Sequence, residues 1–436
     1  MNKVDKEYCN LLKEILDYGR YKNSRAGETV SLFGKSMRFN LQDGLPLLTT
    51  KKVFYKGIIH ELLWFLNGDT NIKYLVDNNV HIWDDDAYRY YLELVEKHNS
   101  LYELKEKIHP SNRDFIYDNL AKEHDDLNVG GTIMFLDEEE MFDMLNKEDT
   151  RNDDIDENVK KYIEIDDFAN SLTFINPLTK EEFIDKVKKH EYLSLFSDVW
   201  DLEDIVNNNF NTECEFTLND YRFGDLGPIY GKQWRGFGKK GFDQIQNIID
   251  TLKTNPNDRR MLCVAFNPDV LDEVALPPCH MMFQFYTYEL QPIERLAWLC
   301  EHSNGEYDEW KTTTHEKMDE LNVPRYSLSC SFTMRSNDFC CGNPYNIAQY
   351  AMLTYMLCEV CNMVPGELVY NGGDVHVYTN HIEGAKEQLS RNGSEIIPKL
   401  KFNRKVTDIN DFKYEDFVIE DYYPDPSIKY ALNVGL

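Results

Sequence analysis

A cysteine and a histidine stand side by side at the start of a predicted strand. Cys279 follows two prolines in the stretch LPPCHMMFQFY. Because proline fixes its own φ and biases the preceding residue toward extended backbone, Pro277 and Pro278 predict a rigid corner. The alternation of apolar and polar residues after His280 predicts a strand. A thiol held still beside an imidazole suits a nucleophile, although a buried structural cysteine gives the same pattern.

Arginines lie at the ends of several predicted elements. Arg259 and Arg260 precede a predicted strand in NPNDRRMLCVAF. Arg335 follows another strand in TMRSND, and Arg25 lies in the glycine-containing loop NSRAGE. Because a guanidinium fork matches phosphate oxygens, arginines beside a thiolate predict a phosphate clamp, although single arginines in an acidic protein are more typical of surface ion pairs. Such a clamp would lower the pKa of Cys279, since positive charge favours the thiolate.

Other polar and aromatic residues allow two interpretations each. Glu61 interrupts the apolar helix predicted in IIHELLWFL, either at its solvent edge or as a buried carboxylate with a raised pKa. Asn346 begins a predicted helix. Its side chain either caps that helix or binds the edge of a pyrimidine by donating and accepting hydrogen bonds together. Trp83 is either core packing or one wall of an aromatic ligand pocket. His376 and Tyr378 share one face of an extended segment after a Gly-Gly turn.

Composition bounds the class of protein. The chain has 436 residues, of which 42% are hydrophobic, enough for a large core. Its net charge of −29 argues against nucleic-acid binding, which needs a basic face, but a few arginines could still hold a small anion. No long apolar run or signal peptide is evident, so we expect a cytoplasmic protein without a membrane span. Cys358 and Cys361 lie in a predicted core helix, which favours buried thiols over a metal site.

Two polar stretches interrupt the apolar periodicity that is typical of a folded core. Residues 97–218 are acidic and rich in asparagine but retain aromatic residues, which indicates an ordered accessory insertion with flexible parts. Residues 291–324 separate two predicted strands and form a second, smaller insertion. We therefore expect one catalytic core, formed by residues 1–96 and 219–436 and interrupted twice.

Seven stretches, taken in order, resemble the thymidylate synthase family. They are SRAGETVSLFGKSMRFNLQDGLPLLTTKK, IIHELLWFLNGDTNIKYL, GDLGPIYGKQWRGFG, DRRMLCVAF, LPPCHMMFQFY, NIAQYAML and GGDVHVYTNH. The resemblance covers residues 8–96, 220–290 and 325–434 and leaves the two polar stretches outside. It implies an α/β fold, α+β in stricter terms, with a large, twisted, mostly antiparallel sheet and helices packed on one face. It also implies a homodimer in which two such sheets lie back to back.

The same resemblance implies a reaction and assigns residues to it. Cys279 would add to C6 of dUMP, so that C5 attacks the one-carbon unit of methylenetetrahydrofolate, and no metal is required. The expected catalytic residues are Cys279, Glu61, His280, Tyr230 and Asn346, the last of which favours uracil over cytosine. The expected dUMP-binding residues are Arg25, Arg335, Ser336, Asp338, Asn346, His376 and Tyr378, with Arg259 and Arg260 reaching across from a second subunit. The expected folate contacts are Lys51, Trp83, Asp338, Gly342 and Tyr345.

Several positions depart from the family pattern. Met334 replaces the usual glutamine, and the run MRSND resembles the phage deoxynucleotide hydroxymethylases, a sister branch. Three residues of the expected folate wall also differ. Cys341 and Asn343 stand where leucine is typical, and Tyr345 stands where phenylalanine is typical. Gly435 and Leu436 extend the usual end of the chain.

These departures all bear on the access of water to the site. After C5 has taken the carbon, hydride from tetrahydrofolate gives dTMP, whereas water gives 5-hydroxymethyl-dUMP. A more polar folate wall and a changed lid would admit water. We therefore favour a deoxyuridylate hydroxymethylase, which would fit a bacteriophage source, with a thymidylate synthase as the alternative. A third interpretation, an inactive scaffold, is disfavoured because Cys279, Glu61 and Asn346 are all retained.

Overall fold

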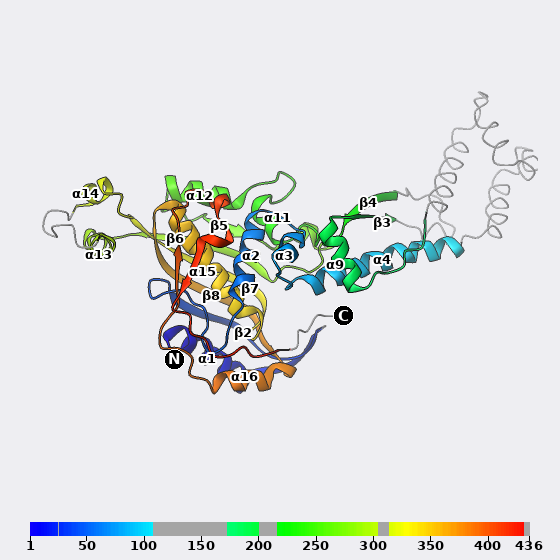
Figure 1. The fold of residues 1–436 in the computed structure, drawn as a ribbon, viewed down its shortest axis with the longest axis horizontal. Coiled ribbons are helices and arrows are strands. Elements are labelled where there is room, and N and C mark those ends of the chain that lie inside the picture. The colour runs from blue at the N-terminus through cyan, green and yellow to red at the C-terminus, as the bar shows by residue number, and fades with distance from the viewer. Residues whose placement is uncertain (25, 108–171, 200–215, 304–313, 431–436) are drawn as a thin grey trace, which may run out of the picture. The chain divides into compact units, whose positions relative to one another are not determined.

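The computed structural model describes residues 1–24, 26–107, 172–199, 216–303 and 314–430. Its contacts divide the chain into two compact units, residues 1–87 with 224–436, and residues 88–223. The first unit contains the largest sheet and all the described candidate site residues (Figure 1). No helix in the described part of the chain is long and apolar enough to cross a membrane.

A six-stranded sheet forms the core of the first unit, in the strand order β1-β2-β8-β7-β6-β5 (Figure 1). Its strands are β1 (Arg20–Ser24), β2 (Gly27–Asn40), β5 (Leu262–Val264), β6 (His280–Glu289), β7 (Tyr326–Asp338) and β8 (Val364–Tyr378). Neighbouring strands pair antiparallel, except β7 and β8, which pair parallel. The expected α/β fold with a large, mostly antiparallel sheet is therefore confirmed.

Strand β6 has the alternation that its sequence predicts. It begins at His280, directly after Cys279. The side chains of Phe283 and Phe285 are buried, whereas Tyr286 is 64% exposed. Because successive residues of a strand point to opposite faces, one face of β6 lies on the core and the other faces outward.

The parallel strands β7 and β8 are connected by the helix α15 (Gly342–Cys361), as parallel pairing requires a crossover. This helix is buried on nearly all sides, in agreement with its continuous apolar sequence. Strand β7 ends at Asp338, in register with His376 of β8. The last residues of both strands and the first turn of α15 therefore share one end of the sheet. Cys358 is buried in α15 as a free thiol, as the sequence predicts.

Other helices of the first unit pack around this sheet. Helix α1 (Lys3–Tyr18) contacts β2 and β8, and α12 (Gln244–Thr254) contacts β5 and α15. Helix α2 (Tyr55–Leu66) contacts both α11 (Tyr230–Arg235) and α15. This unit also contains α3 (Lys73–Asp77), α16 (Ile382–Leu389), β9 (Lys399–Phe402) and β10 (Phe417–Glu420). The contact between α2, α11 and α15 positions side chains from three distant parts of the sequence.

In the segment between β6 and β7, the described residues include the helices α13 (Pro292–His302) and α14 (His315–Glu320). They share a small core of their own, made of Leu296, Leu299, Met318 and Val323. Arg295 is fully buried beside this core and donates to the backbone oxygens of Val323 and Pro324. Its guanidinium also pairs with Asp319 at 2.6 Å. The buried charge is therefore satisfied, as a stable hairpin requires.

The second unit is built around aromatic side chains. It comprises most of α4 (Asp84–Lys107), with α9 (Lys180–Lys189), β3 (Tyr192–Val199) and β4 (Phe216–Arg222), and β3 pairs antiparallel with β4. The rings of Tyr91, Phe183 and Phe223 lie 5.2 to 5.9 Å apart. A capping box between Thr179 and Glu182 starts α9. Phe183 of the acidic stretch thus packs in a core with Tyr91 and Phe223, which flank that stretch.

Candidate active site

The backbone of Cys279 is fixed from two sides. Its N–H donates to the hydroxyl of Tyr230 at 2.9 Å, and its carbonyl accepts from the N–H of Arg335 at 2.9 Å. The guanidinium of Arg335 also donates to the carbonyls of Pro278 at 2.8 Å and Pro277 at 2.7 Å. The corner predicted from the two prolines is therefore held by direct hydrogen bonds, and the thiol has a defined position.

Burial has the largest effect on the ionisation of the Cys279 thiol, and nearby charges have smaller effects. One guanidinium nitrogen of Arg335 lies 3.9 Å from the sulfur and lowers the pKa. Burial raises the pKa by more, so the net direction is upward. Arg335 therefore acts in the expected direction, but the net pKa of the thiol in the single chain is raised, because the degree of burial is not evident from the sequence.

A chain of buried amides leads from the end of β7 to His280. The Nδ2 of Asn337 donates to the Oδ1 of Asn346 at 2.9 Å, and the Nδ2 of Asn346 donates to the Nε2 of His280 at 3.1 Å. The Nδ2 of Asn343 donates in turn to Asn337 at 2.6 Å. The Nδ1 of His280 lies 2.9 Å from the hydroxyl of Tyr350. These contacts fix which end of the Asn346 amide faces each neighbour.

The protonation of His280 follows from this network. Burial lowers the pKa of His280 to about 3, so the ring is neutral near pH 7. Because the Nε2 atom accepts from Asn346, the proton is on Nδ1. A carboxamide can accept twice at its oxygen and donate twice at its nitrogen. After its bonds to Asn337 and His280, Asn346 therefore keeps one acceptor site and one N–H for a ligand with both functions on one edge.

Glu61 accepts a hydrogen bond at each carboxylate oxygen. The Nε1 of Trp83 donates to Oε1 at 2.7 Å, and the Nε2 of Gln349 donates to Oε2 at 2.7 Å. Burial raises the pKa of Glu61 to about 7, although both donors oppose this rise. A carboxyl group with a pKa near the working pH can take up and release a proton, as general acid–base catalysis requires. Of the two interpretations of Glu61, the structure favours the buried carboxyl.

Aromatic contacts connect Glu61 with Cys279. The ring of Tyr230 lies 5.9 Å from that of Trp83 and 5.0 Å from that of His280. Trp83 thus both bonds Glu61 and packs on Tyr230, so it belongs to the wall of the site. The structure brings together all five residues predicted to be catalytic, which are Cys279, Glu61, His280, Tyr230 and Asn346.

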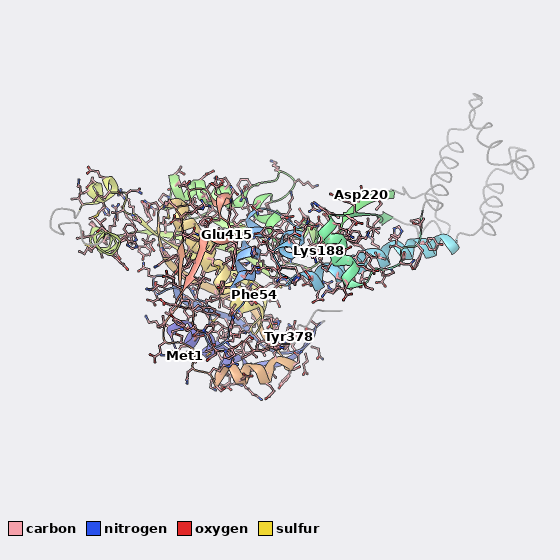
Figure 2. The ribbon with its side chains drawn as sticks, in the orientation of Figure 1. Met1, Phe54, Lys188, Asp220, Tyr378 and Glu415 are labelled. Atoms are coloured by element: carbon pink, nitrogen blue, oxygen red, sulfur yellow. The ribbon has the colours of Figure 1, made fainter. Side chains whose placement is uncertain are left out.

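The end of β8 carries two of the residues predicted to bind dUMP, His376 and Tyr378. His376 is buried, and its ring lies 5.2 Å from that of Tyr378. Tyr378, labelled in Figure 2, is the last residue of β8. The Nδ1 of His376 is 3.5 Å from the carboxylate of Asp374. Burial raises the pKa of Tyr378 to about 12, so its phenol stays protonated and can donate. Ser336 on β7 is partly exposed and in register with Asp374.

The predicted phosphate arginines occupy different environments. Arg335 lies at Cys279, as described above. Arg259 and Arg260 are exposed just before β5, and Arg260 pairs with Asp258 at 2.9 Å. Within the described part of the chain, neither side chain hydrogen-bonds the Cys279 corner of its own chain. Arg25 lies outside the described residues.

Asp338 organises the start of α15. Its Oδ1 accepts from the backbone N–H groups of Cys340 at 2.9 Å and Cys341 at 3.0 Å. Gly342 is the first residue of the helix, and Tyr345 is partly exposed on its first turn. Three of the predicted folate contacts therefore lie on one short turn.

The ammonium of Lys51 is engaged by groups of its own chain. Its side chain is buried, and its ammonium bonds the carbonyl of Cys340. The ammonium also lies 4.7 Å from the centre of the Tyr430 ring. Burial lowers the pKa of Lys51. These contacts hold the ammonium inside the single chain, and its contact with a glutamyl tail stays a prediction.

The positions that depart from the family pattern are not equivalent. Met334 is buried and in register with His280, so it is part of the core. Asn343 is also fully buried, where its amide bonds Asn337. Cys341 and Tyr345 are partly exposed. The C-terminal Gly435 and Leu436 lie outside the described residues.

Sequence reasoning missed the residues that hold the site residues in place. Gln349 and Tyr350 follow Asn346 by three and four positions on α15, so the three side chains share one face of the helix. That spacing was a usable signal. The partnership of Asn337 with Asn346 had no comparable signal, because it joins a strand to a helix across a turn.

Comparisons with known proteins agree over nearly the whole chain. A family model described as thymidylate synthase matches residues 6–434. The thymidylate synthase of Francisella tularensis subsp. holarctica is 32% identical over 443 residues, which cover 98% of this chain and 100% of the relative. The thymidylate synthase of Francisella philomiragia subsp. philomiragia is 31% identical with the same coverage.

Proposed function

Because the chain belongs to the thymidylate synthase family, we propose that it converts dUMP to dTMP by reductive methylation at C5. The family transfers a one-carbon unit to that carbon from methylenetetrahydrofolate, its cosubstrate, and its reaction needs no metal ion. The observation that carries the proposal is the meeting of a fixed thiol, a carboxyl group with a pKa of about 7 and an oriented amide.

Cys279 is the nucleophile in this proposal. Its sulfur forms a bond to C6 of the uracil ring, and the electron pair of the C5–C6 double bond moves toward C5 and O4. Because burial raises the pKa of the thiol, a neutral thioether at C6 is favoured over a buried thiolate once the bond has formed. The positive charge of Arg335 at 3.9 Å assists ionisation before that step.

Asn346 selects the base. Its remaining N–H can donate to O4 of uracil, and its remaining acceptor site can take the N3–H. Cytosine presents an amino group in place of O4 and an unprotonated N3. The amide N–H would then face another N–H donor, and the amide oxygen would face another acceptor, the N3 atom. Because Asn337 and His280 fix the amide orientation, a compensating flip is disfavoured. This supports dUMP over dCMP as the substrate.

Glu61 moves protons at C5 and O4. After C5 has bonded to the one-carbon unit, it must lose its proton before the methyl group can form. A carboxyl group with a pKa of about 7 is partly ionised at neutral pH and can accept that proton, directly or through water. Tyr230 and Trp83 pack around it and limit its contact with bulk solvent.

Hydride, and not water, completes the reaction in this proposal. The relatives are named thymidylate synthase, and the buried Asn343 adds no polar group to an exposed wall. The substitution at Asn343 therefore no longer supports the hydroxymethylase interpretation. Hydroxymethylation to 5-hydroxymethyl-dUMP is the second candidate function, because Cys341, directly before α15, and Tyr345, on its first turn, do place polar groups at partly exposed positions.

We further propose that the working form is a homodimer. The sheet exposes large aromatic side chains, with Phe33 at 87% and Tyr286 at 64%, which a second copy would cover. Arg259 and Arg260, exposed in the single chain, would then contribute to the phosphate site of the other copy. Residues 97–218 and 291–324 would be accessory insertions outside this core.

An assay of purified protein with dUMP and methylenetetrahydrofolate tests the proposal. Dihydrofolate formed in equal amount to a product that has gained a methyl group supports reductive methylation. A product that has gained a hydroxymethyl group, with the folate left as tetrahydrofolate, assigns the second candidate function instead. Turnover of neither kind contradicts both.

A further inference from the structure

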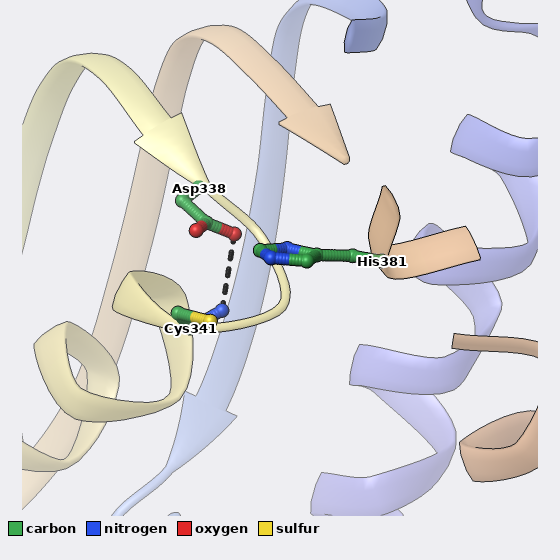
Figure 3. Close-up of side chains that lie close together, drawn as sticks. All are labelled: Asp338, Cys341 and His381. Atoms are coloured by element: carbon green, nitrogen blue, oxygen red, sulfur yellow. Dashed lines mark hydrogen bonds between the residues drawn. The ribbon is translucent and has the colours of Figure 1, made fainter. Parts of the chain in front are cut away.

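Three side chains of different chemistry meet at the start of α15. Asp338 ends β7, Cys341 precedes the first residue of α15, and His381 ends the short turn Thr379–His381 that follows β8. His381 points toward the loop that carries the other two (Figure 3). Their ligand atoms, a carboxylate oxygen, a thiol sulfur and an imidazole nitrogen, all lie within 4.8 Å of one another.

This donor set fits one class of metal ion. Sulfur and imidazole nitrogen are ligands of zinc(II), whereas magnesium and calcium prefer oxygen alone. In a tetrahedral zinc site the ligand atoms are separated by roughly 3.3 to 3.8 Å, given metal–ligand distances of about 2.0 to 2.3 Å. A cluster already within 4.8 Å needs only small side-chain rotations to reach that geometry. Three protein ligands leave the fourth position for water.

The surroundings hold these ligands in place before any metal binds. The Oδ1 of Asp338 is oriented by the N–H groups of Cys340 and Cys341. The imidazole of His381 is buried, with ring centres of Tyr378 and Tyr430 at 5.5 and 4.9 Å. Orientation of ligands by neighbouring groups is a usual property of protein metal sites.

We propose that Asp338, Cys341 and His381 form a zinc(II) site that inhibits the enzyme. Binding replaces the proton of the Cys341 thiol by a sulfur–zinc bond and releases that proton to solvent, with no change of oxidation state. The inhibitory part rests on the proposed function, because zinc would occupy the Asp338 carboxylate that is assigned to the folate. Leucine is the typical family residue at position 341, so the sulfur ligand is a feature of this chain.

The test measures metal binding by the full chain without dUMP or folate. Zinc affinity is obtained by competition with a chromophoric chelator, and cobalt(II) reports sulfur ligation through its charge-transfer absorption. We expect Cys341→Ser to weaken zinc binding at least tenfold and to remove the cobalt–sulfur absorption. His381→Gln should weaken zinc binding similarly. Its cobalt–sulfur absorption should fall only in proportion to the fraction of protein that binds cobalt, because Cys341 is still present. Cys361→Ser, which removes another partly exposed thiol, should change neither signal.

Two results would overturn the site. One is unchanged zinc affinity in Cys341→Ser, and the other is an equal loss in Cys361→Ser, which would mean non-specific binding to thiols. If Cys341→Ser does not fold, Cys341→Leu, with the residue typical of the family, replaces it. A separate titration of zinc against methylenetetrahydrofolate tests inhibition: zinc binding that folate does not weaken would retain the site and reject its inhibitory role.

Discussion

Gln349 donates its side-chain N–H to the Oε2 of Glu61 at 2.7 Å, and this bond opposes the effect of burial on the carboxyl group. Burial alone would raise the pKa of Glu61 beyond about 7, because charge is disfavoured away from water. Gln349 is itself 1% exposed. It therefore acts on the reaction through Glu61 and not through the substrate.

Replacing Gln349 by alanine should shift the pH dependence of the enzyme. Without this donor, the ionised form of Glu61 loses one stabilising hydrogen bond, so its pKa rises. The step that needs the carboxylate should then appear at higher pH, with the acidic inflection of kcat/KM displaced by about one pH unit. The measurement is kcat/KM for dUMP between pH 5 and 9.

The matched control for this experiment is Gln388→Ala. Gln388 is also fully buried, but it bonds Thr50, on a different part of the first unit. Its replacement should lower stability without moving the inflection. An unshifted profile in Gln349→Ala would show that Gln349 does not tune Glu61.

Replacing Asn337 by alanine should weaken the choice between uracil and cytosine. The Oδ1 of Asn346 then loses the donor that fixes its orientation, and a flipped amide becomes accessible. Loss of one buried hydrogen bond corresponds to about 1 to 2 kcal/mol. We therefore expect the selectivity, taken as kcat/KM for dUMP divided by the association constant of dCMP as an inhibitor, to fall roughly 5- to 30-fold. Steady-state kinetics with dCMP as a competitor give both quantities.

Asn247→Ala serves as the control for Asn337→Ala, because Asn247 is exposed on α12. It should leave the selectivity for dUMP unchanged. If Asn337→Ala lowers stability and kcat but keeps the full selectivity, the amide chain has only a structural role.

Replacing Arg335 by glutamine should make the Cys279 thiol less reactive. The guanidinium is the cause that lowers the pKa of this thiol, so its removal leaves the effect of burial unopposed. Alkylation of Cys279 by iodoacetamide at pH 8 should slow roughly tenfold, since the thiolate is the reacting form. Mass spectrometry of the peptide that carries Cys279 follows the reaction.

Arg38→Gln is the control, because Arg38 is exposed and pairs with Glu367 far along the sheet from the thiol corner. Its alkylation rate should equal that of the wild type. Faster alkylation in Arg335→Gln would mean that loosening of the Pro277–Pro278 corner outweighs the loss of charge.

The sequence predicted those features that depend on local pattern. The corner before Cys279, the strand that begins at His280 and the buried α15 follow from proline geometry and hydrophobic alternation, which neighbouring residues determine. The resemblance to a family then brought Glu61 and Asn346 to the same site, although they are far from Cys279 in the chain.

The sequence did not predict how burial competes with charge. The arginines were expected to lower the pKa of Cys279, and the resemblance placed Lys51 at the folate tail. In the single chain, burial outweighs the charge of Arg335 at Cys279 and encloses the Lys51 ammonium, and the degree of burial depends on tertiary packing. Asn343 was similarly placed on a ligand wall, whereas the structure buries it against Asn337. Such pairings join distant segments and leave no periodic signal.

The release of tritium from dUMP labelled at C5 tests the central claim most directly. Both candidate products require Cys279 to add at C6 and C5 to lose its proton, so this measurement does not depend on which product forms. The account predicts release that requires methylenetetrahydrofolate in the wild type and no release above background in Cys279→Ala. No release from the folded wild type, or equal release from Cys279→Ala, would contradict it.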